Sequence, residues 1–182
     1  MRCAMFALLL VMATFCSAFA EVRDFKVVTV KTEDVYQLDL KRMRANVVVT
    51  NAYLLPRQDL IDTAKAAAKK MYDESRMQVI VIKLYPNKEY AEFFPQFVDL
   101  TYAPEGRGWD GKPAAKWVGY IADRMPDEKE MFKINSWVVE NSRNKKTILD
   151  RKKDLAKQME LPVEDTFFPI FSLVPCLMDN ES

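Results

Sequence analysis

The pattern of hydrophobic and polar positions predicts several strands between residues 24 and 51. Residues 24–31 (DFKVVTVK) and 44–51 (RANVVVTN) are rich in β-branched side chains, as strands are. Residues 34–40 (DVYQLDL) alternate with a period of two, which places Tyr36, Leu38 and Leu40 on one face. We therefore expect three strands before the first helix.

The period then changes to that of a helix. After Pro56, which suits a helix start, residues 57–74 carry acidic side chains early and basic ones late. The apolar positions at helical spacing are Leu60, Ala64, Ala67, Ala68 and Met71. An alanine-rich face of this kind allows a helix to lie close to a sheet.

Three further segments predict strands, at residues 77–85 (MQVIVIKLY), 96–103 and 115–122, with a short helix over 87–93. Residues 104–113 lie between the last two strands and contain three of the four glycines. This composition predicts a long hairpin loop.

The C-terminal part is predicted to be helical from about residue 126. One apolar stripe comprises Met131, Ile134, Trp137 and Val138, and a second comprises Ile148, Leu149, Leu155 and Met159. Pro162 ends this region, and the apolar tail 163–178 is expected to lie extended over the core or to form a partner-binding surface.

These elements predict an α+β fold. We expect a mainly antiparallel sheet of five to six strands, packed by one central helix, with a helical C-terminal extension. No repeat or linker divides the chain, so residues 21–182 are expected to form a single domain.

Residues 1–20 have the features of a secretory signal peptide. Arg2 gives a positive start, residues 4–15 are apolar, and Ala18-Phe19-Ala20 offers small residues at the two positions that a signal peptidase reads. We expect cleavage after Ala20 and a periplasmic or secreted protein. The apolar run is shorter than the ~20 residues of a membrane-spanning helix, and Phe15 before Cys16 is too bulky for a favoured lipid-attachment site.

Composition narrows the possible chemistry. Loss of Arg2 leaves 26 basic and 26 acidic side chains, a balance that does not favour nucleic acid as a partner. Cys176 is the one cysteine after residue 20, so no internal disulfide is expected.

The chain has no histidine, which excludes Ser-His-Asp and Cys-His mechanisms and histidine-ligated metals. We expect neither a metal nor a cofactor.

The hairpin loop is the main candidate binding site. Arg107, Trp109, Asp110 and Lys112 gather polar and aromatic groups on one long loop, where binding residues are common. The alternative is that the glycines only make the turn and Trp109 folds back on the sheet.

Other candidate groups have ordinary structural explanations. Cys176 lies between Pro175 and Leu177 and is expected to be a small buried hydrophobe. The Glu89/Glu92 pair is expected on a solvated face, and Asp99 follows simple strand alternation. The basic residues of segment 143–153 are interleaved with acids, as on a solvated helix.

The stretch from about residue 55 to 109 resembles a small bacterial domain family of unknown function. The resemblance rests on the proline-initiated helix with Asp59-Leu60-Ile61, the strand MQVIVIKLY, and Tyr102-Ala103-Pro104-Glu105-Gly106 before Trp109. It implies a bacterial, exported context and a helix-on-sheet core, and it supplies no activity.

The leading hypothesis is a non-enzymatic exported protein of inhibitor, immunity or accessory type, which binds an envelope or extracellular protein. Two alternatives stay open. One is a histidine-free enzyme such as a carboxylate-based hydrolase, and the other is a small-molecule carrier whose tail covers an apolar cavity.

Overall fold

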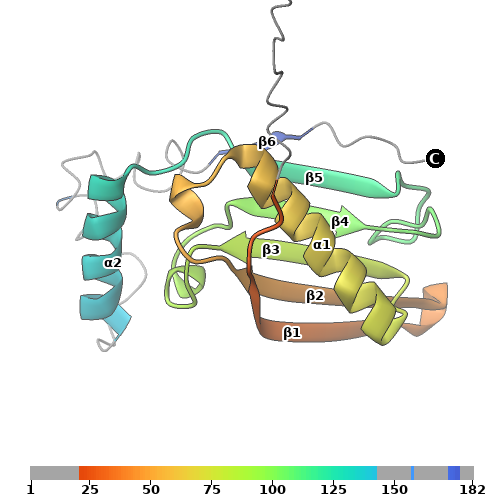
Figure 1. The fold of residues 1–182 in the computed structure, drawn as a ribbon. Coiled ribbons are helices and arrows are strands. Elements are labelled where there is room, and N and C mark those ends of the chain that lie inside the picture. The colour runs from red at the N-terminus through yellow and green to blue at the C-terminus, as the bar shows by residue number, and fades with distance from the viewer. Residues whose placement is uncertain (1–20, 143–156, 158–171, 177–182) are drawn as a thin grey trace, which may run out of the picture.

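The fold is a six-stranded sheet with one helix across a face and a second helix beyond its end (Figure 1). The computed structural model describes residues 21–142, 157 and 172–176. The strands are β1 (Lys26–Val35), β2 (Leu40–Val48), β3 (Val79–Tyr85), β4 (Val98–Tyr102), β5 (Trp117–Ala122) and β6 (Leu173–Pro175). The helices are α1 (Arg57–Ser75) and α2 (Glu128–Ser142), with single 3₁₀ turns η1 (Tyr36–Leu38), η2 (Ala52–Leu54) and η3 (Tyr90–Glu92).

The sheet is mixed but mostly antiparallel. Its spatial order is the chain order, β1 to β6, and every neighbouring pair is antiparallel except β2 and β3. Parallel neighbours need a crossover connection, and α1 provides it. The predicted α+β class with a central helix is confirmed.

The core lies between α1 and one face of the sheet. Along β2, Met43, Ala45 and Val47 are buried on the α1 side, while Arg42 and Arg44, which alternate with them, are only partly buried. From the helix, the buried apolar side chains are Leu60, Ile61, Ala64, Ala67, Ala68 and Met71. The predicted alanine-rich contact face is therefore present.

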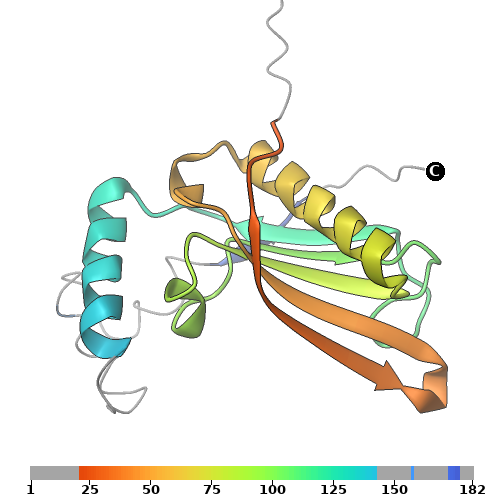
Figure 2. The same ribbon diagram turned by 60° about the horizontal axis from the view of Figure 1, so that its bottom comes forward.

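The prediction of three strands before α1 is wrong: the structure has two, which form a long hairpin that projects beyond the rest of the sheet (Figure 2). Residues 34–40 include the end of β1, the turn η1 and the first residue of β2. Asp39 adopts a left-handed conformation (φ 45°), which helps to reverse the chain. Consequently Tyr36 is 90% exposed, Leu38 is 39% exposed, and Leu40 alone of the three is buried.

The other predicted elements agree with the structure apart from small shifts at their ends. The segment predicted as a short helix contains η3, and β4 and β5 form the predicted hairpin around residues 104–113. The first predicted C-terminal apolar stripe lies on α2, where Met131, Ile134 and Trp137 are buried. The second stripe, the basic run from 143 and most of the tail lie outside the described residues, whereas Leu173–Pro175 is extended and pairs with β5.

Helix α2 is joined to the domain by aromatic contacts and begins with a capping box. The ring centroid of Trp137 lies 5.5 Å from that of Phe93 and 5.8 Å from that of Phe94. At the start of the helix, the Glu130 amide donates to Asp127 Oδ1 (2.7 Å) and the Asp127 amide donates to Glu130 Oε2 (2.9 Å). This local sequence therefore fixes where α2 begins.

The first described residues form a strap that crosses α1 near the start of the helix (Figure 1). Arg23 donates from Nε and Nη2 to Asp59 Oδ2, at 2.9 and 2.6 Å. The Arg23 amide donates to the Thr63 hydroxyl (2.9 Å), and the Glu21 amide donates to Asp59 Oδ1 (3.1 Å). The strap is thus held by polar groups of α1 that are themselves buried.

Within the part of the chain that the structure describes, neither helix is long and apolar enough to cross a membrane.

Candidate functional site

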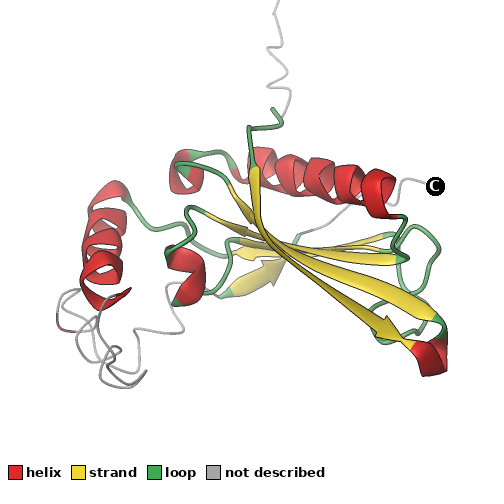
Figure 3. Cartoon of the chain, turned by 90° about the horizontal axis from the view of Figure 1, so that it is seen from below, coloured by secondary structure: helices red, strands yellow, loops and turns green. Residues whose placement is uncertain are grey.

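The side of the sheet opposite α1 carries a row of charged and aromatic side chains, which we call the polar face. It comprises Arg42 and Arg44 of β2, Lys83 of β3, Asp99 of β4 and Tyr120 of β5. Strand register aligns Lys83 with Asp99 and Asp99 with Tyr120. Paired residues point to the same side of a sheet, so these three form a line across it. Figure 3 shows this side below the sheet, away from α1.

The β4–β5 loop, residues 104–113, folds onto the tip of the β1–β2 hairpin. Arg107 Nη2 donates to the carbonyl oxygen of Leu38 (2.7 Å). Gly111 has φ +80°, and a Cβ at this position would lie 3.0 Å from Leu38 Cδ1, so a side chain is disfavoured by both conformation and space. The loop is therefore joined to the hairpin at defined points.

Trp109 connects the loop to the polar face. The guanidinium carbons of Arg42 and Arg44 lie 4.5 and 4.8 Å from the centroid of its ring, within the range of cation–π contacts. Arg42 also donates to the Trp109 carbonyl oxygen (2.5 Å) and to Glu33 Oε2 (3.1 Å). These contacts hold both arginines in place.

A partly buried ion pair occupies the middle of the polar face. Lys83 Nζ lies 3.8 Å from Asp99 Oδ2, and Gln96 Nε2 donates to the same oxygen (2.6 Å). Burial raises the pKa of Asp99, and the positive charges of Lys83 and Arg44 only partly offset this. Asp99 is thus a carboxylate whose charge is less favourable than that of an ordinary surface aspartate.

The two tyrosines of this side differ in exposure. Burial raises the pKa of Tyr85 to about 12, so its hydroxyl keeps its proton at neutral pH. Tyr120 is 42% exposed and Val118 is 36% exposed, which leaves an aromatic and an apolar side chain available on β5.

The structure separates the four predicted binding residues into two groups. Arg107 and Trp109 lie at the junction between loop and hairpin. Asp110 and Lys112 lie at the exposed end of the loop, where Asp110 Oδ1 accepts from the Lys112 amide (3.1 Å) and Oδ2 lies 3.3 Å from Lys112 Nζ. The hydrogen bond from that amide lowers the pKa of Asp110. The proposed alternative, in which Trp109 folds back on the sheet, describes its position in the structure.

Sequence reasoning missed Arg42, Arg44 and Lys83 and treated Asp99 as ordinary patterning. The signal was present for the two arginines, because their spacing of two in the strand RMRAN places them on one face. Their meeting with Trp109, 65 or more residues later, has no local signature.

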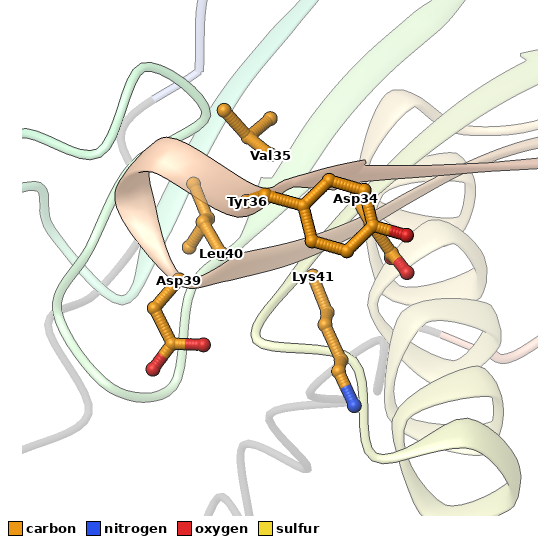
Figure 4. A pocket seen from close by; sticks show the side chains of 6 residues that line it. All are labelled: Asp34, Val35, Tyr36, Asp39, Leu40 and Lys41. Carbon is orange, nitrogen blue, oxygen red and sulfur yellow. The ribbon is translucent and has the colours of Figure 1, made fainter.

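A small open pocket of about 140 Å³ lies at the tip of the β1–β2 hairpin (Figure 4). Its lining residues are Asp34, Val35, Tyr36, Asp39, Leu40 and Lys41. Pockets for cofactors and drug-sized ligands are typically several hundred Å³, so this one suits only a very small molecule. We do not assign it a ligand.

The surroundings of the remaining candidate groups favour structural roles over chemical ones. Burial raises the pKa of the Cys176 thiol, and its side chain packs against the core, which disfavours the reactive thiolate. Glu89 and Glu92 are exposed around the buried Tyr90. Among the described residues, no group of three or more acidic or cysteine side chains is arranged to hold a metal ion.

Comparisons with known proteins identify a crystal structure with a similar fold and the family to which the chain belongs. The fold is similar to that of a crystal structure of a DUF487 family protein from Desulfovibrio piger ATCC 29098, with a TM-score of 0.63 and 19% sequence identity. The similarity covers 86% of this chain and 97% of that chain. No match was found among curated proteins.

A family model described as "Domain of unknown function (DUF4875)" matches residues 24–171. This match confirms the predicted resemblance to a family of unknown function and extends it well beyond residues 55–109. The chain therefore belongs to the DUF4875 family.

Proposed function

We propose that this protein is exported and acts without catalysis, by binding another protein of the cell envelope through its polar face. Export rests on the sequence of residues 1–20, with cleavage after Ala20. The binding part of the proposal rests on the polar face described above. The role of the protein is that of an inhibitor, an immunity-type protein or an accessory factor.

The observation that carries the proposal is the fixed arrangement of Arg42 and Arg44 against Trp109, on the same side of the sheet as the exposed Tyr120. Arginine, tryptophan and tyrosine are the side chains enriched at the energetic centres of protein interfaces. Side chains that are already held in place lose less conformational freedom on binding, which favours affinity.

The charges of the polar face indicate an acidic partner surface. Arg42 pairs with Glu33, and Lys83 pairs with Asp99. Arg44 has no carboxylate within ion-pair distance among the described residues, so it brings positive charge that an acidic side chain of a partner would complement. The partner is therefore expected to present a carboxylate to Arg44 and an apolar or aromatic side chain to Tyr120.

A matched pair of aromatic substitutions tests the proposal. The exported protein and its Tyr120→Ala and Phe132→Ala variants are used to capture cross-linked proteins from an envelope extract. Tyr120→Ala should reduce recovery of a specific partner about tenfold or more, as loss of an interface centre does. Phe132 is 73% exposed on α2, which lies beyond the end of the sheet, so Phe132→Ala should leave capture unchanged. Equal recovery with all three proteins would contradict the proposal.

A carboxylate-based enzyme is the second candidate, favoured by one observation. Asp99 combines a raised pKa with partial exposure beside Lys83, a combination that suits a general acid. Asp99→Asn should then abolish hydrolysis of an envelope polymer while the protein stays folded. If no hydrolysis is detected with the unaltered protein, this candidate is excluded for that substrate.

A further inference from the structure

Asp59 is positioned to receive the new N-terminus that export creates. It lies in the first turn of α1 and is 5% exposed. Its Oδ1 accepts from the backbone nitrogen of Glu21 (3.1 Å), and its Oδ2 accepts from Arg23. Glu21 is also the first residue after the sequence Ala18-Phe19-Ala20, where the signal peptide is expected to be cut.

We propose that a signal peptidase cuts the Ala20–Glu21 bond and that the freed α-ammonium group of Glu21 forms an ion pair with Asp59. This inference rests on the export part of the proposed function. It adds a binding site inside the protein for its own mature N-terminus.

The chemical change at the cut explains why the site is suited to the product. Hydrolysis of the peptide bond consumes one water molecule and gives an Ala20 carboxyl group and a Glu21 amine, which is protonated near neutral pH. The same nitrogen then carries a positive charge and more than one N–H. The donor to the Asp59 carboxylate changes from a neutral amide to an ammonium group, so the hydrogen bond gains the attraction of an ion pair.

The surroundings of Asp59 favour this second cation. Arg23 is shared between two acids, since its Nη1 lies 2.9 Å from Glu21 Oε2 while its Nη2 lies 2.6 Å from Asp59 Oδ2. With the α-ammonium group present, two cations and two carboxylates balance. The hydrogen bond from the Arg23 amide to the Thr63 hydroxyl holds the strap in register, so that the Glu21 nitrogen stays at Asp59.

The test measures how fast the α-amine reacts with an acylating reagent at pH 7, because only the unprotonated amine reacts. The full-length chain is expressed in an exporting bacterium, and the N-terminus of the recovered protein is identified by mass spectrometry. A matched variant carries Ser-Gly inserted between Ala20 and Glu21, which moves the new amine away and leaves Asp59 and Arg23 intact. Acylation is normalised to that of Lys112, whose side chain is 80% exposed.

The expected result is a mature chain that begins at Glu21 and whose α-amine reacts about tenfold more slowly than that of the insertion variant, equivalent to one pKa unit. Asp59→Asn should remove this difference. If the chain is cut at Glu21 but both amines react at the same rate, the Asp59 site is refuted while export stands. If the chain is not cut there, the inference falls together with the export proposal.

Discussion

The two faces of the sheet are made by the same strands, yet they differ in what they bury. Toward α1, β2 presents Met43, Ala45 and Val47 to a layer of alanines and other apolar side chains. On the polar face it presents Arg42 and Arg44, which contact a loop residue that follows two strands later. One face therefore buries apolar surface, whereas the other orders charged and aromatic groups that stay partly accessible.

This difference separates the source of stability from the proposed source of recognition. Burial of apolar area is the main favourable contribution to folding, and the α1 face supplies it. Partly exposed cation–π contacts and ion pairs contribute much less to stability. Substitutions on the two faces should therefore have separable effects on folding and on binding.

The largest expected effect is on the α1 face. Leu60 is fully buried between α1 and the sheet, so Leu60→Ala should lower the free energy of unfolding by about 2–5 kcal/mol, through lost burial and a cavity. Urea denaturation measures this change. Leu54→Ala, at a position 58% exposed in η2, should change it by less than about 0.5 kcal/mol. Similar losses for both variants would mean that the core is not where the structure places it.

A smaller effect is expected where the loop meets the polar face. Trp109→Ala removes the ring that Arg42 and Arg44 contact and should cost about 1–2 kcal/mol of unfolding free energy. It should also speed amide hydrogen exchange at Gly108 and Gly111, whose amides donate hydrogen bonds within the loop.

The control for Trp109 is an aromatic side chain that is more exposed. Phe132 on α2 is 73% exposed, so Phe132→Ala should leave both stability and loop exchange unchanged within about 0.5 kcal/mol. Unchanged exchange in Trp109→Ala would show that the tryptophan does not hold the loop.

The smallest effect concerns the charge of Asp99. Burial raises the pKa of Asp99 in the folded state, so the folded protein favours the protonated carboxyl group. The stability that results is fully present below the pKa of the unfolded state. It is lost as pH rises through the pKa of the folded state. The unaltered protein should therefore lose stability relative to Asp99→Asn as pH rises from 3 to 7. We expect less than about 1 kcal/mol, since the side chain is 25% exposed.

Two measurements check the Asp99 prediction. Carbon NMR of the carboxyl group gives its titration directly, and urea denaturation at each pH gives the stability difference. Asp110→Asn is the matched control of opposite sign, because the pKa of Asp110 is lowered and its contribution is lost as pH falls. A gain in stability of the unaltered protein relative to Asp99→Asn as pH rises from 3 to 7 would contradict the burial argument.

Local patterns predicted most elements because each element's signal lies within its own residues. The helical spacing of Leu60, Ala64 and Ala67 and the proline before them identified α1 almost to the residue. The segment DVYQLDL misled because alternation over a few residues is also compatible with a strand end followed by a tight turn. The left-handed Asp39, which distinguishes the two, is not encoded by alternation.

The sequence by itself determined the α+β class, the helix-on-sheet core and the hairpin around residues 104–113, since hydrophobic periodicity and turn composition are local properties. It also supplied the basis for proposing export. Only the tertiary structure decided that Trp109 lies against Arg42 and Arg44, and that the Glu21 nitrogen meets Asp59. These contacts join residues 38 to 67 positions apart in the chain, and their formation depends on strand order and register, which no single segment specifies.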